Sequence, residues 1–155
     1  MRALILLVLL GGLTPILLVA FGASPLTTDV GYAPEQPIPY SHELHVGQLG
    51  LDCRYCHASV EVSAVSNIPP TQTCMNCHHV IKRDSEALEP IRQSLKTGKP
   101  MRWVRVHNLP DYAYFDHSIH VAKGIGCVSC HGRVDQMPLT KQAVSLQRSE
   151  EHTSE

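Results

Sequence analysis

Cys53-Arg54-Tyr55-Cys56-His57 is the stretch that decides the fold, because its pattern returns at Cys74-Met75-Asn76-Cys77-His78 and Cys127-Val128-Ser129-Cys130-His131. Two thiols on one helical turn can bond the two vinyl groups of a single haem, and the next imidazole then becomes the proximal iron ligand. The sequence thus predicts three covalently attached haem c groups. The attachment residues are Cys53, Cys56, Cys74, Cys77, Cys127 and Cys130, and the proximal ligands are His57, His78 and His131.

Two other uses of cysteine pairs compete with haem attachment. Cys53, Cys56, Cys74 and Cys77 form two Cys-x-x-Cys knuckles at a spacing that zinc ribbons use. A zinc ribbon explains neither the histidine after every pair nor the third pair. Disulfides or thioredoxin-like redox pairs are the other alternative, but no strand-helix pattern surrounds any pair. Haem attachment accounts for all six cysteines at once.

Histidines outside the motifs provide candidates for the sixth iron ligand. A second histidine gives a low-spin, low-potential haem suited to electron transfer. His79 directly follows a proximal ligand, so we expect it to point away from that haem. Methionines 75, 101 and 137 are alternative ligands that packing explains better. The candidate distal ligands are His42, His45, His107, His117 and His120, each with a surface or hydrogen-bonded histidine as the alternative.

An internal repeat organises four of these histidines. Tyr40-Ser41-His42-Glu43-Leu44-His45 and Phe115-Asp116-His117-Ser118-Ile119-His120 both have the pattern aromatic-x-His-x-x-His. Each copy is followed within eight residues by a Cys-x-x-Cys-His motif. At a spacing of three, two imidazoles share one side of a helical turn but diverge enough to reach two haems. We therefore expect closely packed haems.

The N-terminus is apolar from Ala3 to Ala23, after a single positive charge at Arg2. Because about 20 apolar residues span a bilayer, residues 1–23 are predicted to be a membrane anchor, with a cleaved signal or a buried helix as alternatives. The positive-inside rule places the rest of the chain on the periplasmic side of the cell membrane. Residues 24–39 contain four prolines and are predicted to be an extended linker.

The body, residues 40–147, shows no long helical or strand periodicity, except for a helix predicted over residues 82–96 with Pro90 inside it. Only 5% of residues are aromatic, which leaves few large side chains for an ordinary core. We expect a mainly α and irregular chain whose short helices and loops wrap the haems. A net charge of −1 gives no indication of nucleic-acid binding. Three arginines are candidates for pairing with haem propionates, with solvated side chains as the alternative: Arg102, Arg105 and Arg133.

The body also resembles the multihaem cytochrome c subunit of bacterial alternative complex III, a membrane quinol:electron-acceptor oxidoreductase. The resemblance is carried by the repeat at residues 40–45 and by the first two Cys-x-x-Cys-His motifs, the second of which follows Ile68-Pro69-Pro70-Thr71-Gln72-Thr73. Two later stretches also carry it: Trp103-Val104-Arg105-Val106-His107 and Gly132-Arg133-Val134-Asp135-Gln136-Met137-Pro138-Leu139. It implies a membrane-anchored pentahaem subunit. Its partners would be other subunits of a quinol-oxidising complex and a downstream cytochrome c or oxidase.

This chain departs from that pattern, which implies two further Cys-x-x-Cys-His motifs. Residues 148–155 look like the translation of a sequencing adaptor, so we interpret them as a non-native tail on a chain that naturally continues. Missing haems would then borrow histidines from this part. His152 belongs to the tail and is set aside.

The resulting hypothesis is an electron-transfer subunit without a catalytic site of its own. One alternative is a multihaem reductase with an open haem position, against which the abundant histidines argue. The other is the cytochrome subunit of a different membrane oxidoreductase.

Overall fold

The computed structural model describes residues 2–146, and within them the chain forms helices, turns and loops without a strand. This confirms the predicted mainly helical and irregular fold. The tail at residues 148–155, with His152, lies outside the described residues. The elements in chain order are α1 (Arg2–Gly22), α2 (Pro25–Thr28), η1 (Glu43–Gln48), α3 (Cys53–Cys56), α4 (Thr71–His78), η2 (Glu86–Leu88), α5 (Glu89–Thr97), α6 (His117–Ala122), α7 (Cys127–His131) and η3 (Val134–Gln136).

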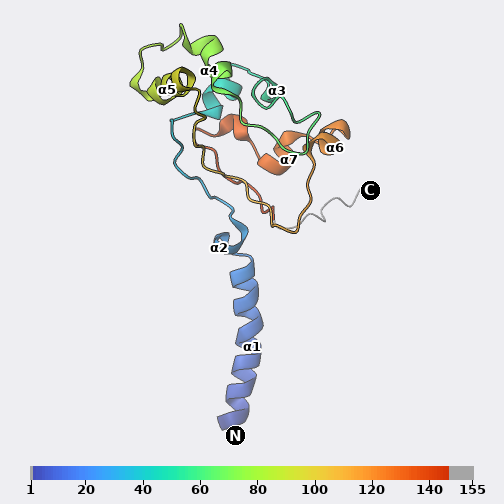
Figure 1. Cartoon of the computed structure of the whole chain (residues 1–155). Helices are drawn as coiled ribbons and strands as arrows, with labels where there is room; N and C mark the ends of the chain where they lie inside the picture. Colours follow the sequence, from blue (N-terminus) through green and yellow to red (C-terminus); the bar gives the residue numbers. More distant parts are fainter. Residues whose placement is uncertain (1, 147–155) are drawn as a thin grey trace.

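Helix α1 stands apart from the body in Figure 1, with the N-terminus at its far end. It continues through Pro15, although proline has no N–H to donate. One turn before Pro15, the carbonyl oxygen of Leu10 accepts a hydrogen bond from the hydroxyl of Thr14 at 2.6 Å. Among the described residues, no helix is long and apolar enough to cross a membrane. The membrane anchor and the cleaved signal both stay predictions.

The segment predicted as an extended linker contains one short helix. Pro25 occupies the first turn of α2, where its missing N–H costs no hydrogen bond. Asp29 ends α2 in a left-handed conformation (φ 56°). The chain then runs without regular structure to residue 41, and Ile38 becomes one of its buried side chains. The extended prediction is therefore wrong over Pro25–Thr28, because a proline is tolerated in the first turn of a helix.

The helix predicted over residues 82–96 begins later than expected. Residues 82–84 are turn, η2 forms a single 3-10 turn, and α5 covers Glu89–Thr97. Pro90 lies in the first turn of α5 rather than inside the helix, because only there is its missing donor harmless. Gly98 follows in the left-handed conformation (φ 68°), as expected for a helix end.

Few apolar side chains are buried in this chain. In the described part, the buried apolar side chains are Ile38, Val60, Ile91 and Met137. A body of about 100 residues ordinarily buries many more. The protein atoms alone thus do not form a conventional core, as the low aromatic content predicts.

Gln142 joins three distant segments of the body. Its side chain is 1% exposed. The side-chain amide donates to the carbonyl of Thr28 at 2.9 Å and accepts from the backbone N–H of Asn108 at 3.1 Å. Its backbone pairs with Gly31 and Tyr32 at 2.8 and 3.0 Å. The segment after α2 is therefore fastened to the end of the body rather than a free tether.

We expect Gln142→Leu to lower the free energy of unfolding by about 2 kcal/mol, because two part-buried backbone groups lose their partners. Urea unfolding of the haem-loaded chain measures this. Gln36→Leu is the matched control: Gln36 makes the same pair of bonds with Val104, both at 3.0 Å, but in exposed positions where water replaces them. Equal losses in the two variants would contradict the role of burial.

Candidate haem-binding site

Each Cys-x-x-Cys pair lies on one short helix. The pairs occupy α3, the second half of α4, and α7. At α3 the side chain of Asp52 caps the helix by accepting from the N–H of Arg54 at 2.8 Å. At α7 the cap is Gly126. The single-turn arrangement expected for haem attachment is present at all three motifs, and all six thiols are free.

Two of the three proximal histidines share one hydrogen-bonding arrangement. The Nδ1–H of His57 donates to the carbonyl of Asn67 at 2.8 Å, and that of His78 to the carbonyl of Ile81 at 2.9 Å. His131 Nδ1 lies 3.3 Å from Nε2 of His107. A carbonyl only accepts, so Nδ1 carries the proton at the first two and Nε2 keeps its lone pair. This is the tautomer in which imidazoles bind metals.

Two pairs of imidazoles from different motifs and repeats face one another. The ring centres of His45 and His78 are 6.2 Å apart, and those of His117 and His131 are 6.3 Å apart. Two imidazoles on opposite sides of one metal ion have ring centres about 6 Å apart, since each metal–nitrogen bond is about 2 Å. Both separations therefore suit a shared metal ion.

The internal repeat is also a structural repeat. Tyr40 stacks on His45 (4.5 Å, 22°) and meets His42 edge-on (4.8 Å, 87°). Phe115 stacks on His120 (4.4 Å, 29°) and meets His117 edge-on (4.7 Å, 88°). The second histidine of each pair donates from Nδ1 to the carbonyl four residues earlier, at 2.8 and 2.6 Å. The aromatic residue thus sets the orientation of both rings in each copy.

The copies differ by one residue, and a π-helix absorbs it. His45 precedes its glycine with positive φ, Gly50, by five residues, whereas His120 precedes Gly124 by four. The first copy is the π-helix η1, and the second is the α-helix α6. A π-bulge accommodates one extra residue in a helix. The chain then leaves both copies alike, with the carbonyls of His45 and His120 accepting from Leu51 and Ile125 at 3.0 and 3.1 Å.

His42, His107 and His131 are part-buried histidines whose pKa values burial lowers. Burial and, after it, the nearby imidazoles, His107 first, together lower the pKa of His131 to about 4. Burial also lowers the pKa of His42 to about 4, together with the neighbouring rings of His57, His45 and His107. The pKa of His107 is lowered by burial alone. These histidines are neutral at physiological pH, as metal ligation requires.

Three other residues near the predicted haem sites, His79, Met137 and Arg133, have ordinary environments. His79 is exposed, with Nδ1 bonded to the carbonyl of Met75 at 2.8 Å, as expected for a ring that points away. Met137 is buried (7% exposed). Arg133 forms a salt bridge with Asp135 at 2.6 Å, and this partner lowers the pKa of Asp135. The propionate role of Arg133 stays a prediction.

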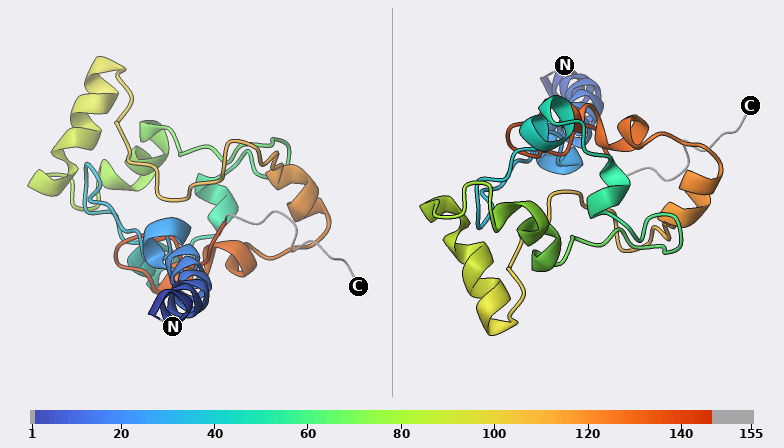
Figure 2. Two further views of the ribbon diagram at one scale, coloured as in Figure 1. Left: turned by 90° about the horizontal axis from the view of Figure 1, so that it is seen from below. Right: turned by 90° about the horizontal axis from the view of Figure 1, so that it is seen from above.

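The first motif contacts both of the others. Asn76, inside the second motif, donates to the hydroxyl of Tyr55, inside the first, at 3.1 Å. Burial raises the pKa of the Cys53 thiol, and its contact with Cys127 of the third motif raises it further. Both views of Figure 2 place α3, which contains the first motif, between α4 and α7, which contain the second and third motifs. The spatial order of the motifs is therefore second, first, third.

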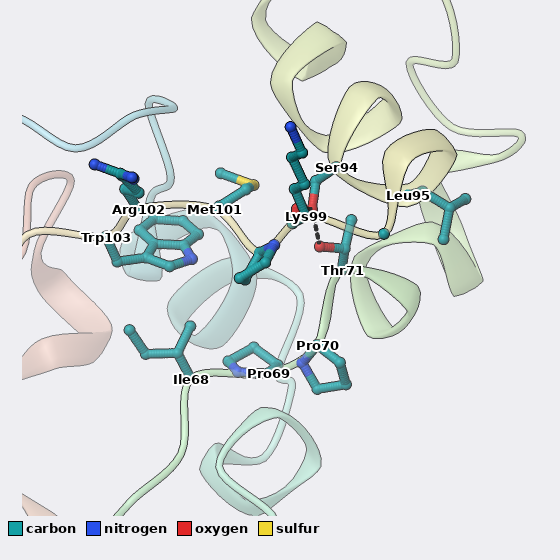
Figure 3. Close-up of a pocket in the computed structure, with 12 residues that line it drawn as sticks. Ile68, Pro69, Pro70, Thr71, Ser94, Leu95, Lys99, Met101, Arg102 and Trp103 are labelled. Atoms are coloured by element: carbon teal, nitrogen blue, oxygen red, sulfur yellow. Dashed lines mark hydrogen bonds between the residues drawn. The ribbon is translucent and has the colours of Figure 1, made fainter.

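A cavity of about 630 Å³ lies beside α4 rather than between the histidines. Figure 3 shows its wall, where the hydroxyls of Thr71 and Ser94 are hydrogen-bonded at 2.8 Å. Its lining residues include Pro70, Leu95 and Trp103 but no cysteine or histidine. The motifs and the cavity are thus separate features.

These residues fit a c-type haem at each motif. The thiol pairs lie on single turns, the proximal imidazoles hold Nδ1 in hydrogen bonds, and two further imidazoles lie opposite at suitable distances. Few apolar side chains of the described residues are buried by the protein itself. Within residues 2–146, no group of three or more His, Cys, Asp or Glu side chains is arranged to hold a bare metal ion.

Comparison with known proteins bears on this site. The chain is similar to the multihaem cytochrome c subunit of menaquinone reductase from Nitratidesulfovibrio vulgaris, with 35% identity over 98 residues, which are 63% of this chain and 46% of the relative. It is also similar to the acrylate reductase cytochrome subunit of Shewanella woodyi, with 30% identity over 90 residues, or 58% of this chain and 59% of the relative. The relatives are cytochrome subunits.

The similarity agrees with the expected class of protein. Both relatives are named as cytochrome subunits of reductases, which agrees with the expected electron-transfer subunit. The chain spans about half the length of the relatives it matches, 46% and 59%. No protein-family model matches it.

Proposed function

We propose that this chain is the electron-transfer subunit of a membrane quinol-oxidising complex and carries three haem c groups. The observation that carries the proposal is the set of three cysteine pairs on single helical turns, with imidazoles from elsewhere facing two of the proximal histidines at 6.2 and 6.3 Å. Two histidines per iron leave no position for a substrate, which suits a relay rather than an enzyme.

Each cofactor would supply one-electron chemistry at its iron, and the residues of the chain would hold it in place. His78 and His45 would be the two ligands of the haem at the second motif, and His131 and His117 those at the third. In the second repeat, the first histidine faces the following motif. The equivalent residue of the first repeat is His42, whose pKa is lowered in part by nearby His57. His42 is therefore the proposed partner of His57, while His107 and His120 remain candidate ligands.

The order of the motifs in space suggests the route of the electron. Because the first motif contacts both others through Tyr55 and Cys53, the haem at Cys53 and Cys56 would be the middle one of the relay. Electrons would then pass between the second and third motifs by way of the first. Such a relay needs short distances between neighbouring haems.

The proposed complex and location rest on the sequence. The motifs at residues 40–45, 68–78 and 132–139 resemble alternative complex III, while the similar proteins are named as subunits of menaquinone and acrylate reductases. The partners would be the other subunits of the complex and a downstream cytochrome c or oxidase. The apolar run after Arg2 favours a chain anchored in the cell membrane with its haems on the periplasmic side.

Expression with a c-type haem maturation system tests the proposal. The mass of the purified chain should include three haems, and its spectrum should be that of low-spin, bis-imidazole iron. Replacing both cysteines of any one motif with alanine should remove one haem, about a third of the haem absorbance. Zinc in place of haem, or a high-spin wild-type haem that binds small ligands, would contradict it.

A further inference from the structure

The loop from residue 59 to residue 67, called here the 59–67 loop, connects the first motif to the segment before α4 and touches histidines from two haem sites. Its only buried side chain among residues 59–67 is Val60, at 9% exposure, while Val62 and Val65 are 84% and 70% exposed. Hydrogen bonds rather than apolar packing therefore define its shape.

The end of the loop holds the proximal histidine of the first motif. The Nδ1–H of His57 donates to the carbonyl of Asn67 at 2.8 Å. The hydroxyl of Ser66 lies 3.2 Å from the same nitrogen. These contacts set both the tautomer and the plane of the His57 ring.

The middle of the loop holds a histidine that lies opposite the third motif. The Nδ1–H of His117 donates to the carbonyl of Ala64 at 2.9 Å, and its backbone N–H donates to the same oxygen at 3.2 Å. The next residue, Ser118, donates its N–H to the carbonyl of Ser63 at 3.2 Å. The beginning of α6 is thus fastened to this loop, and the His117 ring points towards His131 at 6.3 Å.

A clasp between Ser59 and Asn67 closes the loop. The backbone N–H and the hydroxyl of Ser59 donate to Oδ1 of Asn67 at 3.2 and 2.7 Å. The hydroxyl of Ser59 also accepts from the N–H of Asn67 at 3.1 Å. Both side chains are half-buried. The clasp therefore closes the loop that carries the carbonyls of Ala64 and Asn67.

We infer that the 59–67 loop is a shared positioning element for the first and third haem sites, and that Ser59 and Asn67 are its positioning residues. The inference rests on the proposed function, because it assigns His57 and His117 to irons. A hydrogen bond at Nδ1 tunes the basicity and orientation of an imidazole ligand. One loop therefore sets the ligand field at two sites at once, while the second site, oriented by Ile81, is independent of it.

Asn67→Ala, measured as the haem-loaded chain, tests this inference. Electron paramagnetic resonance separates low-spin ferric haems by their g-values, which depend on the angle between the two imidazole planes. The cysteine-to-alanine variants of each motif assign the signals by subtraction. We expect Asn67→Ala to shift the signals of the first and third sites and to leave that of the second unchanged.

Two further variants complete the design. Asn67→Asp keeps the acceptor oxygen of the clasp and should restore the wild-type signals. Thr71→Val removes the bond to Ser94 at the start of α4 (Figure 3) and should leave the first and third signals unchanged. A shift at one site only, at all three sites, or at none in Asn67→Ala overturns the inference. A wild-type chain without three low-spin haems overturns the proposed function instead, so the two failures are distinguishable.

Discussion

Replacing His45 with alanine should convert one of the three proposed haems from low-spin to high-spin iron. His45 is the imidazole that lies 6.2 Å from His78, and its Nδ1–H is held by the carbonyl of Ser41 at 2.8 Å. Without it, His78 would be the one strong protein ligand of the haem proposed at the second motif, which would then be open to water or to added ligands. The ferric resonance spectrum should lose about a third of its low-spin intensity, and the reduced protein should bind one carbon monoxide.

His79→Ala is the control for this change. His79 follows His78 directly, but its exposed ring is bonded to the carbonyl of Met75. Its removal should leave all three haems low-spin. His45→Met provides a second comparison, because a thioether keeps the iron low-spin while raising its reduction potential. If His45→Ala retained every low-spin haem, the pairing of His45 with His78 would be wrong.

Gly47→Ala should strongly destabilise the body. Gly47 lies in η1, and a Cβ built on it would clash with the backbone carbonyl oxygen of Asp135 in η3. A carbonyl of the main chain cannot turn aside as a flexible side chain does, so η1 or η3 must move. We expect a loss of about 3 kcal/mol in the free energy of unfolding, measured by denaturant titration.

The same movement should disturb the haem site, because η1 also contains His45. Gly50→Ala is the matched control, three residues along. Gly50 has a left-handed backbone (φ 71°) but open space around its Cβ position, so only backbone strain of about 1 kcal/mol is expected. Equal unfolding midpoints for the two variants would show that the contact between η1 and η3 does not determine stability.

The sequence was a good guide to features that depend on neighbouring residues. Cys-x-x-Cys-His requires only one helical turn, and α3, α4 and α7 each provide it. The repeated aromatic-x-His-x-x-His unit returned as two nearly identical ring arrangements, because the aromatic residue and both histidines share a single turn. Helix boundaries were less certain: Pro25 and Pro90 both begin helices.

Other features were absent from the sequence pattern. The role of Gln142 could not be foreseen, since its partners lie 34 and 114 residues away. The clasp of Ser59 and Asn67 consists of residue types common in any loop. The π-helix corresponds to a difference that is visible in the sequence: Gly50 follows His45 by five residues, whereas Gly124 follows His120 by four.

By itself, the sequence determined which residues can attach a haem and which imidazoles are available to ligate it, because both depend on residue type and on spacing within a turn or two. Only the tertiary structure decided that His45 faces His78, that His117 faces His131, and that the first motif lies between the other two. Those relations depend on the paths of the connecting loops. The paths are set by hydrogen bonds and contacts between residues that are far apart in the sequence.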